Sequence, residues 1–217
     1  MSKSKRAIQH NEAGLAYYQA WEIDNAITEF QKAIQLEPDN PEFHLNLARA
    51  YARGGKFDQA MLSLGEFLRT ETDEVIAERY ERLFSSAMDE VETLMVDKMR
   101  QLKFPVQQIG KGIQMWLEYR ITVGRKPLRI PKPALWAAAI AYAITKINFV
   151  QLTRAEIAAA FGVNERSLKE KFGELVSTLD LMPADYRYFT GKENPLDKLV
   201  EAAQLLEEME RRFKADE

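Results

Sequence analysis

The 217-residue chain contains no cysteine, which excludes disulfide bonds, thiol chemistry and cysteine-ligated zinc. It also lacks an uninterrupted run of about 18 to 20 apolar residues, the length that a membrane-spanning helix needs. The first residues, MSKSKR, are followed by polar residues and not by the apolar stretch of a signal peptide. We therefore expect a cytoplasmic protein that does not engage a membrane.

Patterns that indicate catalysis are also missing from the sequence. No glycine-rich phosphate-binding loop is present, and Gly110 to Gly112 fall within a helical pattern. The two histidines, His10 and His44, are 34 residues apart, and side-chain packing explains this spacing better than metal binding does. The sequence predicts that the chain is not an enzyme and has no cofactor and no metal site.

The net charge of −3 hides an uneven distribution along the chain. Residues 1–95 hold 10 Lys and Arg against 17 Asp and Glu, and residues 173–217 hold 6 against 11. Residues 96–172 reverse this balance, with 14 Lys and Arg against 5 Asp and Glu. A basic central region therefore lies between two acidic flanks.

An internal repeat with a period of 34 residues begins near the N-terminus. A shift of 34 aligns Gly14 with Ala48, and small residues at Ala26 and Ala60 also match. Further aligned pairs, mostly bulky residues that would fill the space between two helices, are Tyr17 and Tyr51, Phe30 and Leu64, and Ala33 and Phe67. This pattern resembles the tetratricopeptide repeat (TPR). It implies two helical hairpins in residues 1–72. The stretch from residue 73 to residue 102 contains no Gly or Pro, and we expect it to form one or two long helices that cap the repeats and connect them to the next domain.

The first helix of each TPR hairpin lines a concave surface that holds extended or helical peptides in this family. The resemblance therefore implies a groove for a protein or peptide ligand. We assign to this groove Asn11, Leu15, Tyr18, Asn46, Arg49 and Arg53. A second interpretation stays open, in which the repeats only mediate self-association and the chain forms a homo-oligomer.

The stretch from Ala134 to Thr145, ALWAAAIAYAIT, carries no charge on any helical face. A helix that is apolar all round must be surrounded by protein, and this one is too short to cross a membrane. We expect it to form the centre of a five-helix unit, whose first helices span about 83–102 and 106–121. The expected fold class is all-α.

Residues 153–175 carry a helix-turn-helix pattern. Thr153 and Glu156 form a predicted capping box, Gly162 supplies the turn, and Asn164 caps the second helix. The stretches GRKPLRIPKPALWAAAIAYAITK and LTRAEIAAAFGVNERSLKEKFGEL resemble one cyclin-type repeat of transcription factor IIB. That resemblance implies a cyclin-like domain in residues 103–181, whose last two helices contact double-stranded DNA, and a role in transcription-related regulation.

Clustered Lys and Arg in the basic central region suit a polyanion such as DNA. The DNA-binding residues that we expect are Arg125, Lys126, Arg129, Lys132, Arg154, Arg166, Lys169 and Lys171. In the alternative interpretation, the Lys and Arg side chains of the basic region balance the charge of the acidic flanks within the same molecule and hold the repeats or the last helix against it. The chain is then a TPR scaffold that contacts only proteins.

Residues 182–217 are expected to form a loop and an amphipathic helix. Tyr186, Tyr188 and Phe189 lie in the loop and are predicted to anchor it to the core. Beyond Pro195, a helical stripe of apolar residues comprises Leu196, Leu199, Val200, Ala203, Leu206, Met209 and Phe213. This stripe is predicted to fold back over the domain, or to meet a partner or a second copy of the chain.

Overall fold

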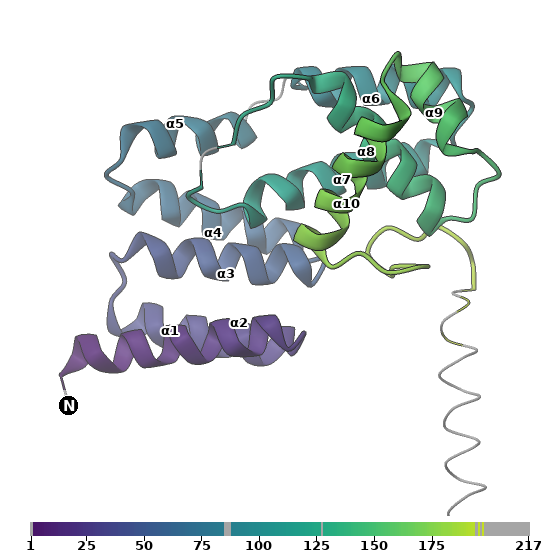
Figure 1. The fold of residues 1–217 in the computed structure, drawn as a ribbon. Coiled ribbons are helices and arrows are strands. Elements are labelled where there is room, and N and C mark those ends of the chain that lie inside the picture. The colour runs from purple at the N-terminus through teal and green to yellow at the C-terminus, as the bar shows by residue number, and fades with distance from the viewer. Residues whose placement is uncertain (1, 85–87, 127, 194, 196, 198–217) are drawn as a thin grey trace, which may run out of the picture.

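The computed structural model describes residues 2–84, 88–126, 128–193, 195 and 197, and these residues are arranged as helices joined by turns without any strand (Figure 1). The all-α prediction is confirmed. The α-helices are α1 Lys3–Gln19, α2 Ile23–Leu36, α3 Pro41–Arg53, α4 Phe57–Thr70, α5 Glu74–Glu81, α6 Glu90–Gln101, α7 Val106–Thr122, α8 Pro133–Ile147, α9 Arg154–Phe161 and α10 Glu165–Leu179. A short 3-10 helix, Arg82–Phe84, follows α5. In the part of the chain described, no helix is long and apolar enough to cross a membrane.

The first four helices form two hairpins, α1 with α2 and α3 with α4, which stack through α2 and α3. The small residues of the repeat lie where the helices cross, and Gly14, Ala26 and Ala60 are buried. Helix α3 begins at Pro41 because the Asn40 side chain accepts a hydrogen bond from the Glu42 backbone N–H. The hairpin geometry that the 34-residue period predicts is therefore present.

Residues 73–102, which were expected to form one or two long helices, contain the two shorter helices α5 and α6. Helix α5 packs on α4, with the rings of Phe67 and Tyr80 in an edge-to-face contact whose centroids are 5.0 Å apart. Helix α6 begins at Glu90, and not near Leu83, because Asp89 and Glu92 form a capping box that fixes its start.

Helices α6 to α10 form a second unit around α8, which contacts each of the other four. Ten of the residues of α8 are buried, including its alanine run and Trp136, so the prediction of a central helix surrounded by protein is confirmed. The driving force is burial of apolar surface, because residues 134–145 of α8 carry no charge on any face.

The predicted helix-turn-helix caps are confirmed within this unit. Thr153 and Glu156 form a capping box at the start of α9, and Gly162 ends α9 in the left-handed conformation with φ of 64°. The Asn164 side chain accepts hydrogen bonds from the backbone N–H groups of Arg166 and Ser167 at the start of α10. The second helix is longer than expected and runs to Leu179.

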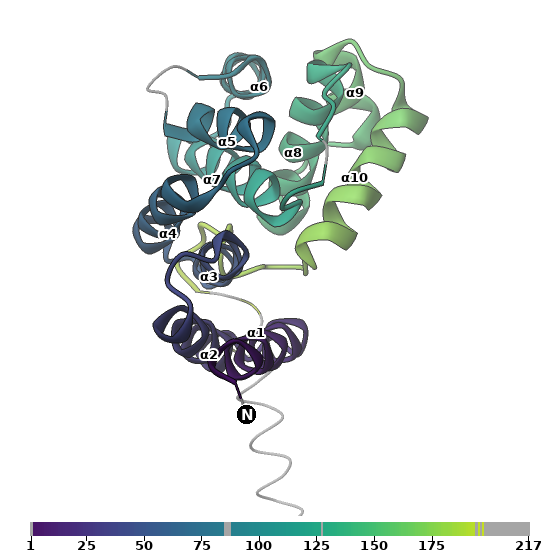
Figure 2. The ribbon, with the colours of Figure 1, turned by 90° about the vertical axis from the view of Figure 1, so that its left-hand side faces the viewer.

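The two units are packed against each other through α3 and α7. Ile121 of α7 is fully buried in one apolar cluster with Leu45 and Ala48 of α3, and Leu117 packs against the same cluster. Figure 2 shows α3 between the first hairpin and the helical unit, with the segment that follows α10 running beside it. The face of α3 that was expected to hold a ligand therefore lies partly against the chain's own helical unit.

Candidate peptide-binding cleft

The residues assigned to the peptide groove are in contact with one another across α1 and α3. The Asn46 Nδ2 donates a hydrogen bond to Asn11 Oδ1 at 3.0 Å, and Arg49 Nη1 donates one to Asn46 Oδ1 at 3.1 Å. The guanidinium carbon of Arg49 lies 5.4 Å from the ring centroid of Tyr18, and that of Arg53 lies 4.1 Å from it. Leu15 is half-buried on the same helix as Tyr18. These side chains therefore lie along one row on α1 and α3.

One end of this row is closed by the chain itself. Arg53 is only 4% exposed, and its Nη2 donates a hydrogen bond to Asp180 Oδ2 at 2.8 Å. The Arg53 guanidinium also stacks on the Trp21 ring, with 4.6 Å between its carbon and the ring centroid. The segment that follows α10 therefore occupies the groove at this end, and Arg53 holds that segment in place of an external ligand.

The closing segment is anchored by a buried ionic cluster that sequence reasoning missed. Arg187 pairs with Glu118 at 2.5 Å and with Asp185 at 2.8 Å, and all three side chains are fully buried. The Tyr188 hydroxyl donates a hydrogen bond to Glu118. Burial raises the pKa of Glu118 to about 7, and the nearby Arg187 charge opposes this shift only in part. Tyr188 thus anchors the loop as predicted, whereas Tyr186 is 56% exposed.

The other end of the row opens into a cleft of about 510 Å³ between the repeats and the helical unit. Glu42, Leu45 and Arg49 of α3 form one wall. The other wall consists of residues 122–126, at the end of α7 and in the turn after it, and of Thr178 of α10. The structure thus brings Arg49 of the expected peptide groove together with Arg125 and Lys126 of the expected DNA-binding set.

Hydrogen bonds from α5 hold the basic turn in a fixed position. The Tyr80 hydroxyl donates to the Gly124 carbonyl at 2.9 Å, and Arg79 donates to the Gly124 and Lys126 carbonyls. The Arg125 guanidinium pairs with Glu71 at 2.9 Å. Lys126 is exposed and has no ion pair among the described residues, so its charge is available to a ligand.

Two residues that line this cleft have a buried polar atom without a hydrogen-bond partner in the described part of the chain. These atoms are Arg49 Nε and the Thr122 hydroxyl. Buried polar groups are almost always paired, because leaving one unpaired costs about 1–3 kcal/mol. Unpaired donors that converge on a cleft therefore mark it as a place where acceptor atoms of a ligand or water complete the bonding.

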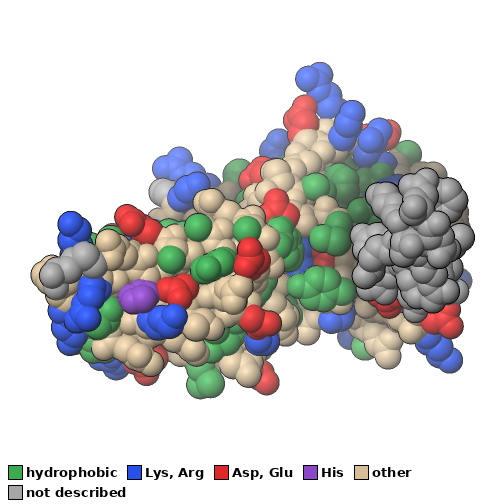
Figure 3. Space-filling model, turned by 90° about the horizontal axis from the view of Figure 1, so that it is seen from below, with side chains coloured by type: hydrophobic (Ala, Val, Ile, Leu, Met, Phe, Trp, Pro, Cys, Tyr) green, Lys and Arg blue, Asp and Glu red, His purple; other side chains and the backbone are tan. Residues whose placement is uncertain are grey.

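The eight residues expected to bind DNA fall into two groups. Arg125, Arg154, Arg166 and Lys171 each pair with a carboxylate; their partners are Glu71, Glu165, Glu170 and Glu174 respectively. Lys126, Arg129, Lys132 and Lys169 are exposed and have no ion pair among the described residues. The cations are thus not gathered into one unpaired patch. On the face seen in Figure 3, acidic and basic side chains are interspersed over the repeat hairpins.

The two histidines make hydrogen bonds within the repeats. His10 Nδ1 lies 2.6 Å from Glu29 Oε2, and His44 Nε2 lies 2.7 Å from the Pro38 carbonyl oxygen. Among the described residues, no group of three or more His, Asp or Glu is placed to hold a metal ion.

Comparison with known proteins matches residues 14–55 to a family model described as TPR repeat. No curated protein and no solved structure matches the chain. No comparison matches residues 103–181, so the cyclin-type resemblance stays a prediction. The repeat part of the chain consists of TPR-like helical hairpins, a module that commonly binds protein or peptide partners and is typically not enzymatic.

Proposed function

We propose that this chain is a protein-interaction adaptor that binds an acidic peptide segment in the cleft between its repeats and its helical unit. The observation that carries this proposal is the convergence of unpaired donors and cations there. Arg49, Arg125 and Lys126 face the cleft, and Glu42 is the carboxylate among its lining residues. An excess of cations over carboxylates favours an anionic ligand.

The closed end of the groove already binds a carboxylate in the way proposed for the ligand. There, Arg53 already holds the Asp180 carboxylate of an irregular segment, and the Tyr186 hydroxyl lies 3.5 Å from the Arg53 carbonyl oxygen. An external acidic segment would make equivalent contacts at the open end with Arg49 and Lys126. The unpaired Thr122 hydroxyl and Arg49 Nε would donate hydrogen bonds to its carbonyl or carboxylate oxygens.

Fluorescence anisotropy with a labelled glutamate-rich octapeptide and its glutamine-rich counterpart tests the proposal. We expect binding of the glutamate peptide only, weakened at least fivefold by Arg49→Ala or Lys126→Glu. Thr122→Val should also weaken binding. It should leave the stability of the unliganded protein unchanged, because the Thr122 hydroxyl makes no hydrogen bond among the described residues.

Lys5→Glu is the matched control, because Lys5 is exposed near the start of α1 and the charge change is the same as in Lys126→Glu. It should bind the glutamate peptide as the unsubstituted protein does. Equal weakening by Lys5→Glu would show a non-specific charge effect and would overturn the cleft assignment, as would equal affinity for the two peptides.

Duplex DNA is the second candidate ligand, favoured by the helix-turn-helix geometry of α9 and α10. Arg166 is 88% exposed at the side chain, and Lys169 is exposed one turn later on α10. Contact with about four to six phosphates would give a logarithmic salt dependence of affinity with a slope of roughly −3 to −5. The regulatory role in transcription depends on this second candidate.

Anisotropy of a labelled random duplex at low salt tests DNA binding directly. Arg166→Glu combined with Lys169→Glu should abolish it. If the duplex does not bind, or if this double substitution leaves its affinity unchanged, the chain is a scaffold that contacts proteins alone.

A further inference from the structure

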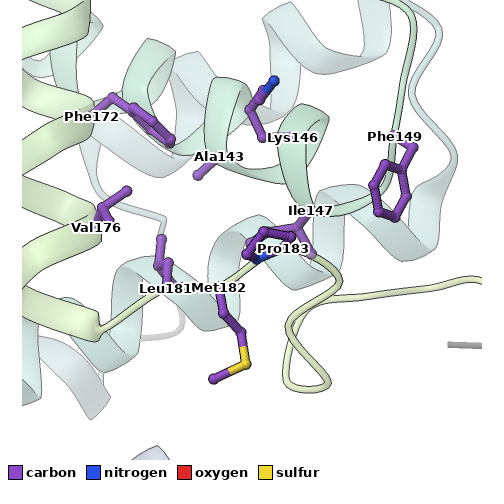
Figure 4. Close-up of a pocket in the computed structure, with 9 residues that line it drawn as sticks. All are labelled: Ala143, Lys146, Ile147, Phe149, Phe172, Val176, Leu181, Met182 and Pro183. Atoms are coloured by element: carbon purple, nitrogen blue, oxygen red, sulfur yellow. The ribbon is translucent and has the colours of Figure 1, made fainter. Parts of the chain in front are cut away.

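An apolar groove of about 400 Å³ lies on the helical unit, away from the peptide-binding cleft. Figure 4 shows its walls: Phe172 and Val176 come from α10, Ala143 and Ile147 from α8, and residues 181–183 close one side. Its lining is apolar except for Lys146. Hydrophobic side chains also gather on the helical-unit part of the face seen in Figure 3.

Two large apolar side chains that line the groove are partly exposed to solvent. Phe149 is 52% exposed and Met182 is 37% exposed. Exposed apolar surface next to a preformed groove marks an interaction site. The groove is therefore suited to an occupant with an apolar face.

The course of the chain brings its own C-terminal region to this groove. The Asn148 side chain donates a hydrogen bond to the Tyr188 carbonyl at 3.2 Å and accepts one from the Thr190 backbone N–H at 2.8 Å. The Phe189 ring lies against Phe149, with 6.3 Å between ring centroids. Residues 188–190 are thereby fixed at the rim of the groove.

We propose that the apolar stripe of residues 196–213 docks into this groove of the same molecule. The stripe lies outside the described residues, and its apolar spacing comes from the sequence. Residues 191–195 form a connection that spans at most about 17 Å, so Leu196 begins within reach of Phe149. Such a short tether gives the stripe a local concentration in the millimolar range, which favours docking within one molecule over docking between molecules.

Charge complementarity agrees with this occupant. Lys146, the cation at the groove, is exposed and has no ion pair among the described residues. The stripe is accompanied by Glu201, Glu207, Glu208 and Glu210. A helix that buries its leucines in the groove places acidic side chains along the rim, where Lys146 can pair with one of them.

The absence of native cysteine permits a direct test in the full chain. Met182→Cys combined with Leu199→Cys is treated with a short bifunctional maleimide at micromolar protein. We expect most of the protein to form an intramolecular crosslink, seen as a monomer of altered mobility and confirmed by peptide mass spectrometry. Leu62→Cys with Leu199→Cys is the control, because Leu62 on α4 is 73% exposed but lies outside the groove, and it should crosslink at least fivefold less.

A second pair of variants separates docking from simple proximity. In the Met182→Cys and Leu199→Cys background, Val200→Asp with Leu206→Asp should lower the crosslink yield at least fivefold, because it places carboxylates in the apolar stripe. Gln204→Asp adds the same group outside the stripe and should leave the yield unchanged.

A crosslinked dimer in place of the monomer would show that the stripe engages a second copy of the chain. A yield no higher than that of the Leu62 control would show that the stripe does not use this groove. Either result overturns the proposal.

Discussion

Arg53 of the second repeat hairpin donates a hydrogen bond to Asp180 at 2.8 Å, although 127 residues separate them in the sequence. Arg53 is buried beneath the rings of Tyr18 and Trp21, whereas the Asp180 side chain is half exposed. The contact joins the repeats to the end of α10. It therefore helps to set the shape of the cleft proposed to bind a peptide, because the walls of that cleft come from both units.

Asp180→Asn should destabilise the protein by about 1–2 kcal/mol, because it leaves the buried Arg53 charge without its carboxylate. Asparagine is the suitable replacement, since Asp180 has a positive φ of 48° and asparagine tolerates the left-handed region. The midpoint of urea unfolding measures the change. Asp24→Asn, which removes a carboxylate paired with Lys56 on the surface, should cost no more than about 0.5 kcal/mol. Equal effects of the two substitutions would contradict the role of Arg53.

Glu118 should make stability depend on pH between about 4.5 and 7. Burial raises its pKa from the ordinary value of 4.5 to about 7, so in this window the folded protein retains a proton that the unfolded chain releases. The stabilising contribution of Glu118 is complete below pH 4.5 and is lost as pH rises to about 7, a loss on the order of 3 kcal/mol.

Urea unfolding of the unsubstituted protein and of Glu118→Gln across this pH range isolates the effect, because glutamine does not titrate. The stability of the unsubstituted protein relative to the variant should fall as pH rises. A difference that stays constant between pH 4.5 and 7 would show that Glu118 is ionised throughout.

Gly14→Ala should destabilise the first hairpin by about 1–3 kcal/mol, because an added Cβ would lie 2.6 Å from the Phe30 ring. Gly65→Ala on α4 is the matched control, since its Cβ would meet no atom within 4 Å, and it should stabilise the protein by about 0.5–1 kcal/mol. Thermal unfolding followed by circular dichroism distinguishes these opposite signs. A Gly14→Ala protein as stable as the unsubstituted one would mean that Phe30 moves freely.

Local signals in the sequence predicted the features that depend on neighbours along the chain. Gly14 and Ala26 mark the repeat because small residues allow helices to approach, and Thr153 with Glu156 marks the start of α9 because a capping box involves only four consecutive residues. The start of α6 was placed too early, near Leu83. The signal for the true start was the same type of box, Asp89 with Glu92, but the apolar spacing before it favoured a helix that begins earlier.

The candidate site was predictable only in part, for a physical reason. The alignment of repeats placed Asn46 and Arg49 on the inner face of the hairpins, and both lie there. It gave no indication that Arg53 would be covered by Asp180, or that Arg125 would pair with Glu71, because each of these contacts joins segments far apart in sequence.

The sequence by itself determined the helices, their caps, the 34-residue hairpins and the buried central helix α8, since each follows from the periodicity of apolar residues and from local hydrogen bonding. The tertiary structure alone decided which cations stay unpaired and which part of the repeat groove stays open. Those properties depend on the packing of α7 and of the segment after α10 against α3, and such packing is set by shape and charge across the whole molecule.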